Sequence, residues 1–352
     1  MRPVAVRILH PDPGPDAGPL ESWVADTRRR VAERHVRGFR AAGADDVRVV
    51  AGPPDDTPFG RRLRELVASD RPAGGLVVLG SGAIPLAMLA DRRDLVATAG
   101  ADARRALTNN RYSADVVAVS CAAAGLHDLP DLPGDNALPR WLEETAGYEV
   151  ADRRRRWRLA IDLDGPLDVL LTATTRRTDN DPDAPADVPT GAVRERWSAI
   201  QARAADPRAE LLVAGRTAAA TLAWLERHTA SRTRALVEER GLRTARDGQR
   251  PPASVLGVLL DRDGAAALGP LLGRLADAAL VDTRVLLAHR LGGDERAWPS
   301  PEDRFASDLL LPEGIADPWL RDLTRSALEA PIPILLGGHT LVGPGVRLVL
   351  RG

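Results

Sequence analysis

The chain has 352 residues, of which 44% are hydrophobic and 28% charged, and its formal net charge is −1. This balance is typical of a soluble globular protein and excludes bulk charge as a reason to bind nucleic acid or an anionic membrane. The single cysteine excludes an internal disulfide and any multi-thiolate metal site, and the complete absence of lysine excludes Schiff-base chemistry and a P-loop lysine.

The first half of the chain alternates strand and helix signals. In chain order, we predict strands at 3–9, 46–51, 75–79, 115–120 and 157–162, and helices over 20–43 and 61–69. Such alternation predicts an α/β fold with a Rossmann-like, mostly parallel sheet covered on both faces. We place this first domain at residues 1–175.

The pattern stops at residues 176–192, which are rich in Asp, Pro and Thr and read as an exposed linker. A second α/β domain is predicted over 193–352. Its expected strands are 210–214, 255–260, 283–288 and 332–336, and its expected helices are 218–239 and 265–279. No apolar run approaches the roughly 20 residues that span a bilayer, and residues 1–11 do not resemble a signal peptide. We expect a cytoplasmic protein; the sequence leaves its oligomeric state open.

Two carboxylates, Asp162 and Asp164, stand at the end of the expected strand 157–162. Strand ends in α/β sheets are where ligands bind, and paired carboxylates suit a divalent cation such as Mg²⁺. The alternative is structural: Asp164 caps a helix that begins near Pro166, with Asp168 in its first turn.

Two further segments of the first half are candidate ligand contacts. Gly80, Ser81 and Gly82 follow an apolar strand, where a ligand can approach the backbone, although a tight turn needs the same residues. A polar loop precedes the strand at 115–120, and its arginine suits an anion; its members are Asn109, Asn110, Arg111, Tyr112 and Asp115. The alternative for this loop is a turn with internal hydrogen bonds.

In the second half, Arg216 and Thr217 follow a strand and open a helix, an arrangement that suits an anion or a simple helix cap. His289 and His339 each follow an expected strand, and four carboxylates lie near His289 in the sequence: Asp282, Glu302, Asp303 and Asp308. If the two histidines converge, they would suit a metal hydrolase; a lone histidine at a strand end is otherwise structural. The arginine run 153–156 is read as a solvated face or a phosphate-attracting surface.

Three segments resemble the MobA-like nucleotidyltransferases, a superfamily that includes molybdenum-cofactor and 2-phospholactate guanylyltransferases. They are the strand that runs through Gly80–Gly82 into Ile84-Pro85-Leu86, the loop and strand at 107–119, and IDLDGPLDVLL at 161–171. The likeness covers residues 1–172 and implies a nucleotide site with Mg²⁺ on Asp162 and Asp164. Arg111 would clamp a phosphate, and Asn109 and Asn110 would orient the base or acceptor.

The chain departs from that family in two places. After the first strand it has His10-Pro11-Asp12-Pro13-Gly14-Pro15 in place of a glycine-rich loop with Arg and Pro-Lys, and Ala83 replaces a metal-binding Asp. The leading hypothesis is binding of a nucleotide or phosphorylated metabolite, with Mg²⁺-dependent nucleotidyl transfer. The alternatives are a non-catalytic binding protein with a degenerate transferase fold, and a hydrolase centred on His289 and His339.

Overall fold

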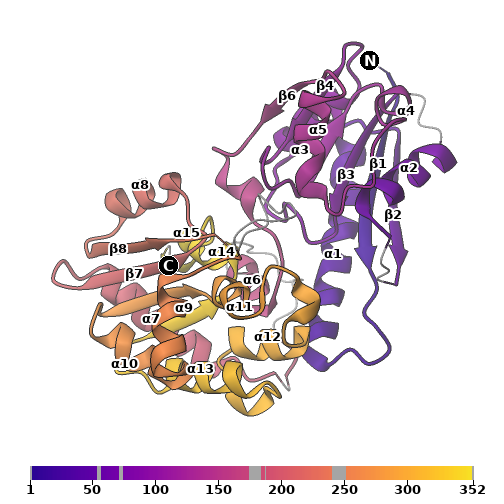
Figure 1. Ribbon diagram of the computed structural model, residues 1–352. Coiled ribbons are helices and arrows are strands. Elements are labelled where there is room, and N and C mark those ends of the chain that lie inside the picture. The colour runs from indigo at the N-terminus through magenta and orange to yellow at the C-terminus, as the bar shows by residue number, and fades with distance from the viewer. Residues whose placement is uncertain are drawn as a thin grey trace. The chain divides into compact units, whose positions relative to one another are not determined.

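The computed structural model describes residues 2–53, 57–70, 74–173, 184–186, 188–239 and 251–350. The chain divides into two compact units: residues 1–16 and 25–163 form the first, and residues 17–24 and 164–352 form the second. Each unit is one sheet with helices packed against it (Figure 1), so the α/β class is confirmed. Most of the predicted linker 176–192 lies outside the described residues. Among those described, no helix is both long and apolar enough to cross a membrane.

The sheet of the first unit has six strands in the order β2-β1-β3-β5-β4-β6. Their bounds are β1 (Val4–Pro11), β2 (Asp46–Gly52), β3 (Gly75–Gly80), β4 (Arg105–Thr108), β5 (Val116–Val119) and β6 (Glu149–Asp152). Only β5 pairs antiparallel with its neighbours. The helices are α1 (Pro19–Ala41), which begins in the second unit's residues, α2 (Phe59–Asp70), α3 (Leu89–Ala99), α4 (Ala122–Gly125) and α5 (Leu138–Glu144).

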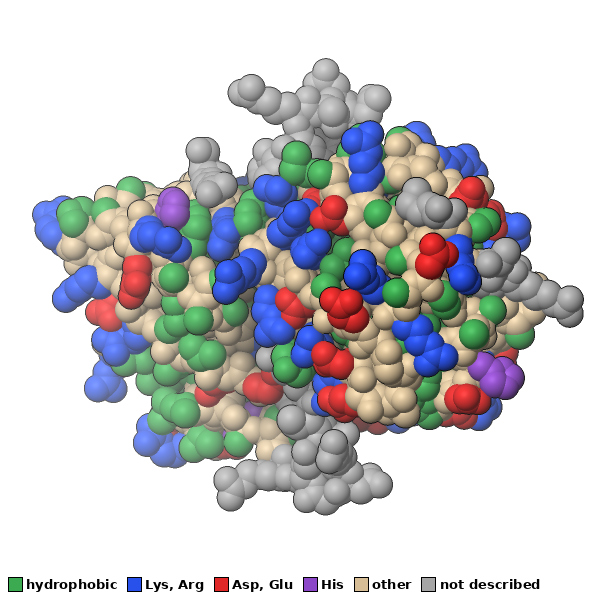
Figure 2. Space-filling view, turned by 90° about the horizontal axis from the view of Figure 1, so that it is seen from above, with side chains coloured by type: hydrophobic (Ala, Val, Ile, Leu, Met, Phe, Trp, Pro, Cys, Tyr) green, Lys and Arg blue, Asp and Glu red, His purple; other side chains and the backbone are tan. Residues whose placement is uncertain are grey.

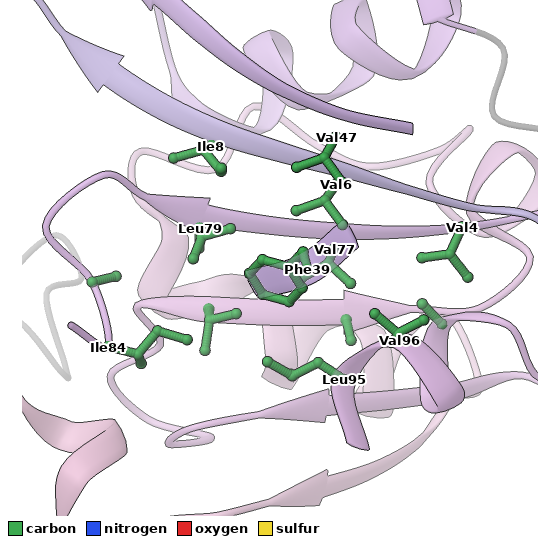
Figure 3. Packing of buried hydrophobic residues seen from close by; sticks show 14 of the residues in the cluster. Val4, Val6, Ile8, Phe39, Val47, Val77, Leu79, Ile84, Leu95 and Val96 are labelled. Carbon is green, nitrogen blue, oxygen red and sulfur yellow. The ribbon is translucent and has the colours of Figure 1, made fainter. Parts of the chain in front are cut away.

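Alternation along the strands of this sheet creates a core on each face. On one face, Val4, Val6 and Ile8 of β1 pack with Phe39 of α1 and Leu95 of α3 (Figure 3). The residues between them in the strands face a second cluster, which α2 and α5 cover. Each large aliphatic side chain buried in this way contributes about 1.5–3 kcal/mol. Successive side chains of a strand point to opposite faces of the sheet. Because apolar side chains occupy both sets of positions here, helices cover the sheet on both faces.

The sheet of the second unit has four parallel strands in the order β10-β9-β7-β8. They are β7 (Glu210–Gly215), β8 (Arg232–Val237), β9 (Ala278–Asp282) and β10 (Ile334–Gly337). The helices of this unit are α6 (Pro166–Ala173), α7 (Gly191–Ala204), α8 (Ala219–His228), α9 (Val255–Asp263), α10 (Leu268–Gly273), α11 (Thr283–Leu291), α12 (Pro301–Asp308), α13 (Pro318–Leu328), α14 (His339–Val342) and α15 (Val346–Leu350).

Several predicted elements were wrong. The expected strand 157–162 is a 3₁₀ turn over Trp157–Ala160, and only Asp162 forms a bridge, with Ala83. The expected strands 255–260 and 283–288 are helices α9 and α11, which Ser254 and Asp282 cap by accepting hydrogen bonds from backbone N–H groups. The helix expected over 218–239 ends at His228 and is followed by β8, and the one expected over 265–279 gives way to β9.

Candidate functional site

Polar side chains of the second unit gather at the carboxyl ends of its parallel strands. After β7 the chain goes to β8 on one side, while β9 lies on the other side of β7. In open α/β sheets, ligands bind at such a reversal of strand order, outside the carboxyl ends. Arg216 directly follows β7, Asp282 ends β9, and His339 follows β10 after one glycine. The fold therefore places these three residues at the edge where a ligand is expected.

Arg216 and Asp282 form a bidentate ion pair across the reversal point. Nε of Arg216 donates to Oδ2 of Asp282 at 2.6 Å, and Nη2 donates to Oδ1 at 3.1 Å. The Asp282 carboxylate also accepts from the backbone N–H groups of Arg216 and Arg284. Burial acts to raise the pKa of Asp282, but the Arg216 guanidinium outweighs it and holds that pKa below its ordinary value. Asp282 is thus an ionised, fully occupied carboxylate that fixes Arg216.

Gly215 makes this pairing sterically feasible. Its φ is +130°, and a Cβ at this position would collide with the Cβ of Asp282. Only glycine combines that backbone conformation with so close an approach. The glycine before Arg216 therefore lets β7 and β9 bring their end residues into contact.

His339 lies half-buried at the start of α14, with a fixed orientation. Its Nδ1 lies 2.8 Å from the backbone carbonyl oxygen of Arg216. Gly343 leaves room for the ring, since a Cβ there would lie 2.9 Å from Cε1. Burial, followed by the positive charge of Arg216, lowers the pKa of His339. The imidazole is therefore held neutral beside the ion pair.

The second unit has another buried ion pair, formed by Arg284 and Asp308. Nη2 of Arg284 donates to Oδ2 of Asp308 at 2.7 Å, and Nη1 donates to Oδ1. Arg284 is 6% exposed and Asp308 2%. Despite its burial, the Arg284 guanidinium keeps its proton, because the Asp308 carboxylate raises the pKa of Arg284. Burial raises the pKa of Asp308, and the Arg284 guanidinium acts against that rise. The buried pair is a structural support for the edge rather than a solvent-facing group.

Asp168 is another buried carboxylate of the second unit. Its Oδ2 accepts hydrogen bonds from the backbone N–H groups of Asp164 at 3.0 Å and Gly165 at 2.9 Å, so Asp168 caps α6. Burial raises its pKa well above 3.8, and the negative charges of Asp164 and Asp308 add to this effect. The neutral carboxylic acid of Asp168 therefore persists to higher pH than that of an exposed aspartate.

The two aspartates of the predicted metal pair fall in different units. Asp164 is exposed and belongs to the second unit, where its charge acts on Asp168, Arg216 and His339. Asp162 belongs to the first unit, where its Oδ1 accepts from the backbone N–H of Leu163 at 2.8 Å. Within the described ranges, no three His, Cys, Asp or Glu side chains form a group that could hold a metal ion. A Mg²⁺ site on Asp162 and Asp164 stays a prediction.

At the corresponding edge of the first unit, Ser81 contacts a histidine. Oγ of Ser81 lies 3.0 Å from Nδ1 of His10, and the exposed fractions of the two residues are 2% and 3%. Gly80 and Gly82 flank the serine, and a Cβ on Gly82 would lie 3.0 Å from Oδ1 of Asp162. The glycine turn is thus closely packed around a buried pair.

The predicted loop at 109–115 uses most of its polar groups internally. Asn109 is 3% exposed; its Nδ2 donates to Asp115 at 2.6 Å and to the Leu159 carbonyl at 2.9 Å, and its Oδ1 accepts from the backbone of Asp115. Arg111 pairs with Glu143 at 3.0 Å and donates to the carbonyl of Val150. These contacts agree with the structural alternative for this segment, a turn with internal hydrogen bonds.

The remaining members of that loop are less enclosed. Asn110 accepts a hydrogen bond from the backbone N–H of Tyr112, whose ring is exposed and lies under the guanidinium of Arg154. In the run 153–156, Arg153 and Arg156 pair with Asp94, and Arg154 pairs with Asp152. Basic and acidic side chains are likewise interspersed over the face shown in Figure 2. Local pairing of this kind is typical of a solvated face.

His289 lies on α11 rather than at a strand end, and its two ring nitrogens are occupied. Nδ1 accepts from the backbone N–H of Ser254 at 3.1 Å, and Nε2 lies 2.9 Å from Oδ2 of Asp261. His339 instead contacts Arg216. The structure therefore gives the two histidines separate sets of partners.

Two important residues escaped the sequence reasoning. Arg284 was hidden because 283–288 was read as a strand, although Asp282 before an apolar run is a helix-cap signal. His10 was read only as part of a proline-rich loop. Thr217, which was predicted, has a buried Oγ1 without a partner among the described residues.

No known family model matches the chain, and no curated protein matches it either.

Proposed function

We propose that the second unit binds a nucleotide or another phosphorylated metabolite at the carboxyl edge of its sheet. One observation carries this proposal: Arg216 lies at the reversal of strand order, and Asp282 holds it there through two hydrogen bonds. A guanidinium has five N–H donors and forms paired hydrogen bonds with phosphate oxygens. Because one edge is already fixed on Asp282, little side-chain entropy is lost when the remaining donors bind an anion.

The surroundings of Arg216 support the same function. The side chain is 15% exposed, and the described residues leave its Nη1 donors unused. A Cβ on Gly338 would lie 3.9 Å from Nη2 of Arg216, an ordinary van der Waals distance, so the backbone at Gly338 does not crowd the guanidinium. The hydroxyl of Thr217 supplies a second donor next to it. Since the chain has no lysine, the cationic contact to a phosphate here is made by arginine.

Binding is a better-supported function than nucleotidyl transfer. Transfer in the manner of the MobA-like enzymes would use Asn109 and Arg111 on the ligand, whereas both side chains have protein partners in the first unit. Asp282 and Asp308 are likewise occupied by guanidinium groups. Asp282 and Asp308 are therefore not available as Mg²⁺ ligands, and the proposed binding does not depend on a metal ion. A binding protein that has the degenerate fold is consistent with these contacts.

Ligand titration tests this function. Wild-type protein is screened by thermal shift against nucleoside mono- and triphosphates and sugar phosphates, with and without Mg²⁺, and hits are measured by isothermal titration calorimetry. Arg216→Gln is expected to weaken binding about tenfold to a hundredfold, because a hydrogen bond to a charged group contributes about 1.5–3 kcal/mol. Arg262→Gln, at an exposed arginine paired with Asp263, is the matched control. Failure of every phosphorylated compound to bind, or equal affinity in Arg216→Gln, would refute the proposal.

A further inference from the structure

We propose that the phosphorylated ligand also carries a hydroxyl group, which donates a hydrogen bond to Nε2 of His339. The ligand class is then a sugar phosphate, a polyol phosphate or a ribonucleotide. This inference rests on the proposed function, since it concerns the same edge of the second unit.

The contact on Nδ1 determines what Nε2 can do. The atom facing Nδ1 is the carbonyl oxygen of Arg216, 2.8 Å away, and a carbonyl oxygen only accepts hydrogen bonds. Nδ1 must therefore carry the proton. In a neutral imidazole the other nitrogen then has a lone pair and no hydrogen. No hydrogen-bond partner lies on Nε2 within the part of the chain that the structure describes.

The electrostatic setting keeps the imidazole in this form. Burial and the positive charge of Arg216 both lower the pKa of His339. At neutral pH, Nε2 is therefore an acceptor and not a donor. A phosphate oxygen placed against it would bring two lone pairs together, so Nε2 selects a donor group on the ligand.

The edge thus offers two chemically different positions. Arg216 has only donors, so it suits the phosphate. His339 offers an acceptor, and the Asp164 carboxylate adds negative charge that acts on both residues. A ligand that fits both positions has an anionic group and a separate donor.

An ammonium group is a poorer fit than a hydroxyl at His339. The positive charge of Arg216, which disfavours an imidazolium, also disfavours another cation next to Nε2. The negative charges of Asp282 and Asp164 oppose this effect, but each is a smaller influence on His339 than the charge of Arg216. A neutral hydroxyl donates a hydrogen bond without that repulsion.

The first arm of the test uses wild-type protein and small phosphate esters that carry hydroxyl groups, an ammonium group or neither. Glycerol 3-phosphate is compared with propyl phosphate, which has no hydroxyl, and with phosphoethanolamine, which has an ammonium group. AMP is compared with its 2′,3′-dideoxy form. Calorimetry is expected to give the hydroxyl-bearing member of each set about three- to tenfold tighter binding, the range for one net hydrogen bond.

The second arm removes the acceptor. His339→Phe keeps a ring but loses Nε2, and it is expected to abolish the preference for hydroxyl-bearing ligands, measured as the ratio between the affinities for glycerol 3-phosphate and propyl phosphate. His339→Gln, which keeps an amide oxygen as an acceptor, is expected to restore part of the preference. His228→Phe, at an exposed histidine on α8, is the matched control. A two-bond ¹H–¹⁵N NMR spectrum of wild-type protein should show His339 protonated at Nδ1 only.

The outcomes separate this inference from the proposed function. If phosphorylated ligands bind but hydroxyl-bearing and hydroxyl-free forms have equal affinity, the hydroxyl contact is wrong and the phosphate site stands. If phosphoethanolamine binds best, the donor is an amine and the ligand class is wrong. If no phosphorylated compound binds, both proposals fall. Should His339→Phe not fold, the wild-type series and the NMR spectrum decide the question alone.

Discussion

Asp308 accepts hydrogen bonds from both terminal nitrogens of Arg284, and the two side chains are almost completely buried in the second unit. Removing two charges from water is costly, so the net contribution of such a pair depends on what replaces it. The pair is therefore suited to a double-mutant test.

Breaking this pair from one side should be strongly destabilising. Arg284→Met or Asp308→Leu alone leaves one buried charge without its partner, and we expect a loss of about 3–5 kcal/mol in the free energy of unfolding. The double variant leaves no charge, so we expect it to recover most of that loss. Urea unfolding followed by circular dichroism measures all four proteins. Additive losses in the double variant would contradict the buried ion pair.

Gly215→Ala tests the contact between the ends of β7 and β9. The new Cβ meets the Cβ of Asp282 and is also held at a positive φ, so we expect a loss of about 2–4 kcal/mol from strain and overpacking. Gly264→Ala is the matched control, because Gly264 has a φ of +84° in the same unit but open space at its Cβ position. Its loss should be smaller, about 1–2 kcal/mol. Equal losses would mean that the approach of Asp282 is not limiting.

Asn109→Ala distinguishes a structural loop from a ligand contact. Its side chain bonds Asp115 and the carbonyl of Leu159 in a buried setting. Its removal should cost about 1–3 kcal/mol, because buried polar groups lose their partners. We expect affinity for phosphorylated ligands to stay unchanged. Asn110→Ala, with a single backbone contact, should lose less stability. Weaker ligand binding by a fully stable Asn109→Ala protein would restore the ligand-reading hypothesis.

The raised pKa of Asp168 predicts a specific pH dependence. Above 3.8 the unfolded chain releases the Asp168 proton, while the folded chain keeps it until its raised pKa is reached. The folded state then binds more protons, so this group lowers stability as pH rises through that window. Asp168→Asn retains an oxygen for the N–H groups of Asp164 and Gly165 but cannot ionise.

We therefore expect Asp168→Asn to gain stability relative to wild type as pH rises, with the smallest difference at low pH. The difference between the two proteins in urea unfolding, taken at each pH from 3.5 to about 8, isolates Asp168 from other titrating groups. A pH-independent difference would show that Asp168 has the same pKa in the folded and unfolded chain.

The sequence predicted best those strands in which a glycine or a polar residue ends a run rich in Val, Ile and Leu. Strands β1, β3, β5, β7 and β10 belong to this group. It failed for short apolar runs such as 283–288, because a run of this length has no distinguishing period and the capping contact of Asp282 is tertiary as well as local. Residues 157–162 failed because their backbone pairs at only one position, Asp162 with Ala83.

The candidate site was predictable in part for a related reason. Arg216 and His339 stand directly after strands, so their position at the sheet edge follows from chain order and parallel pairing. The contacts made by their side chains do not follow from the sequence. Arg216 pairs with a residue 66 positions away, and Nδ1 of His339 contacts a backbone oxygen 123 positions away. Likewise, the spacing of Asn109 and Arg111 cannot show that the protein itself occupies their hydrogen bonds.

The reversed direction of β5 has a practical consequence for spectroscopy. Because β5 is antiparallel to β3, Val119 lies opposite Leu76, so the only cysteine, Cys121, follows β5 at the edge where β3 begins. The Ser81–His10 pair lies at the other edge, after β3 ends. Cys121 is partly exposed, so a maleimide fluorophore or nitroxide can be attached there without cysteine removal and away from the Ser81–His10 pair. A second label on one thiol engineered into the second unit then allows the distance between the two labels to be measured before and after ligand addition.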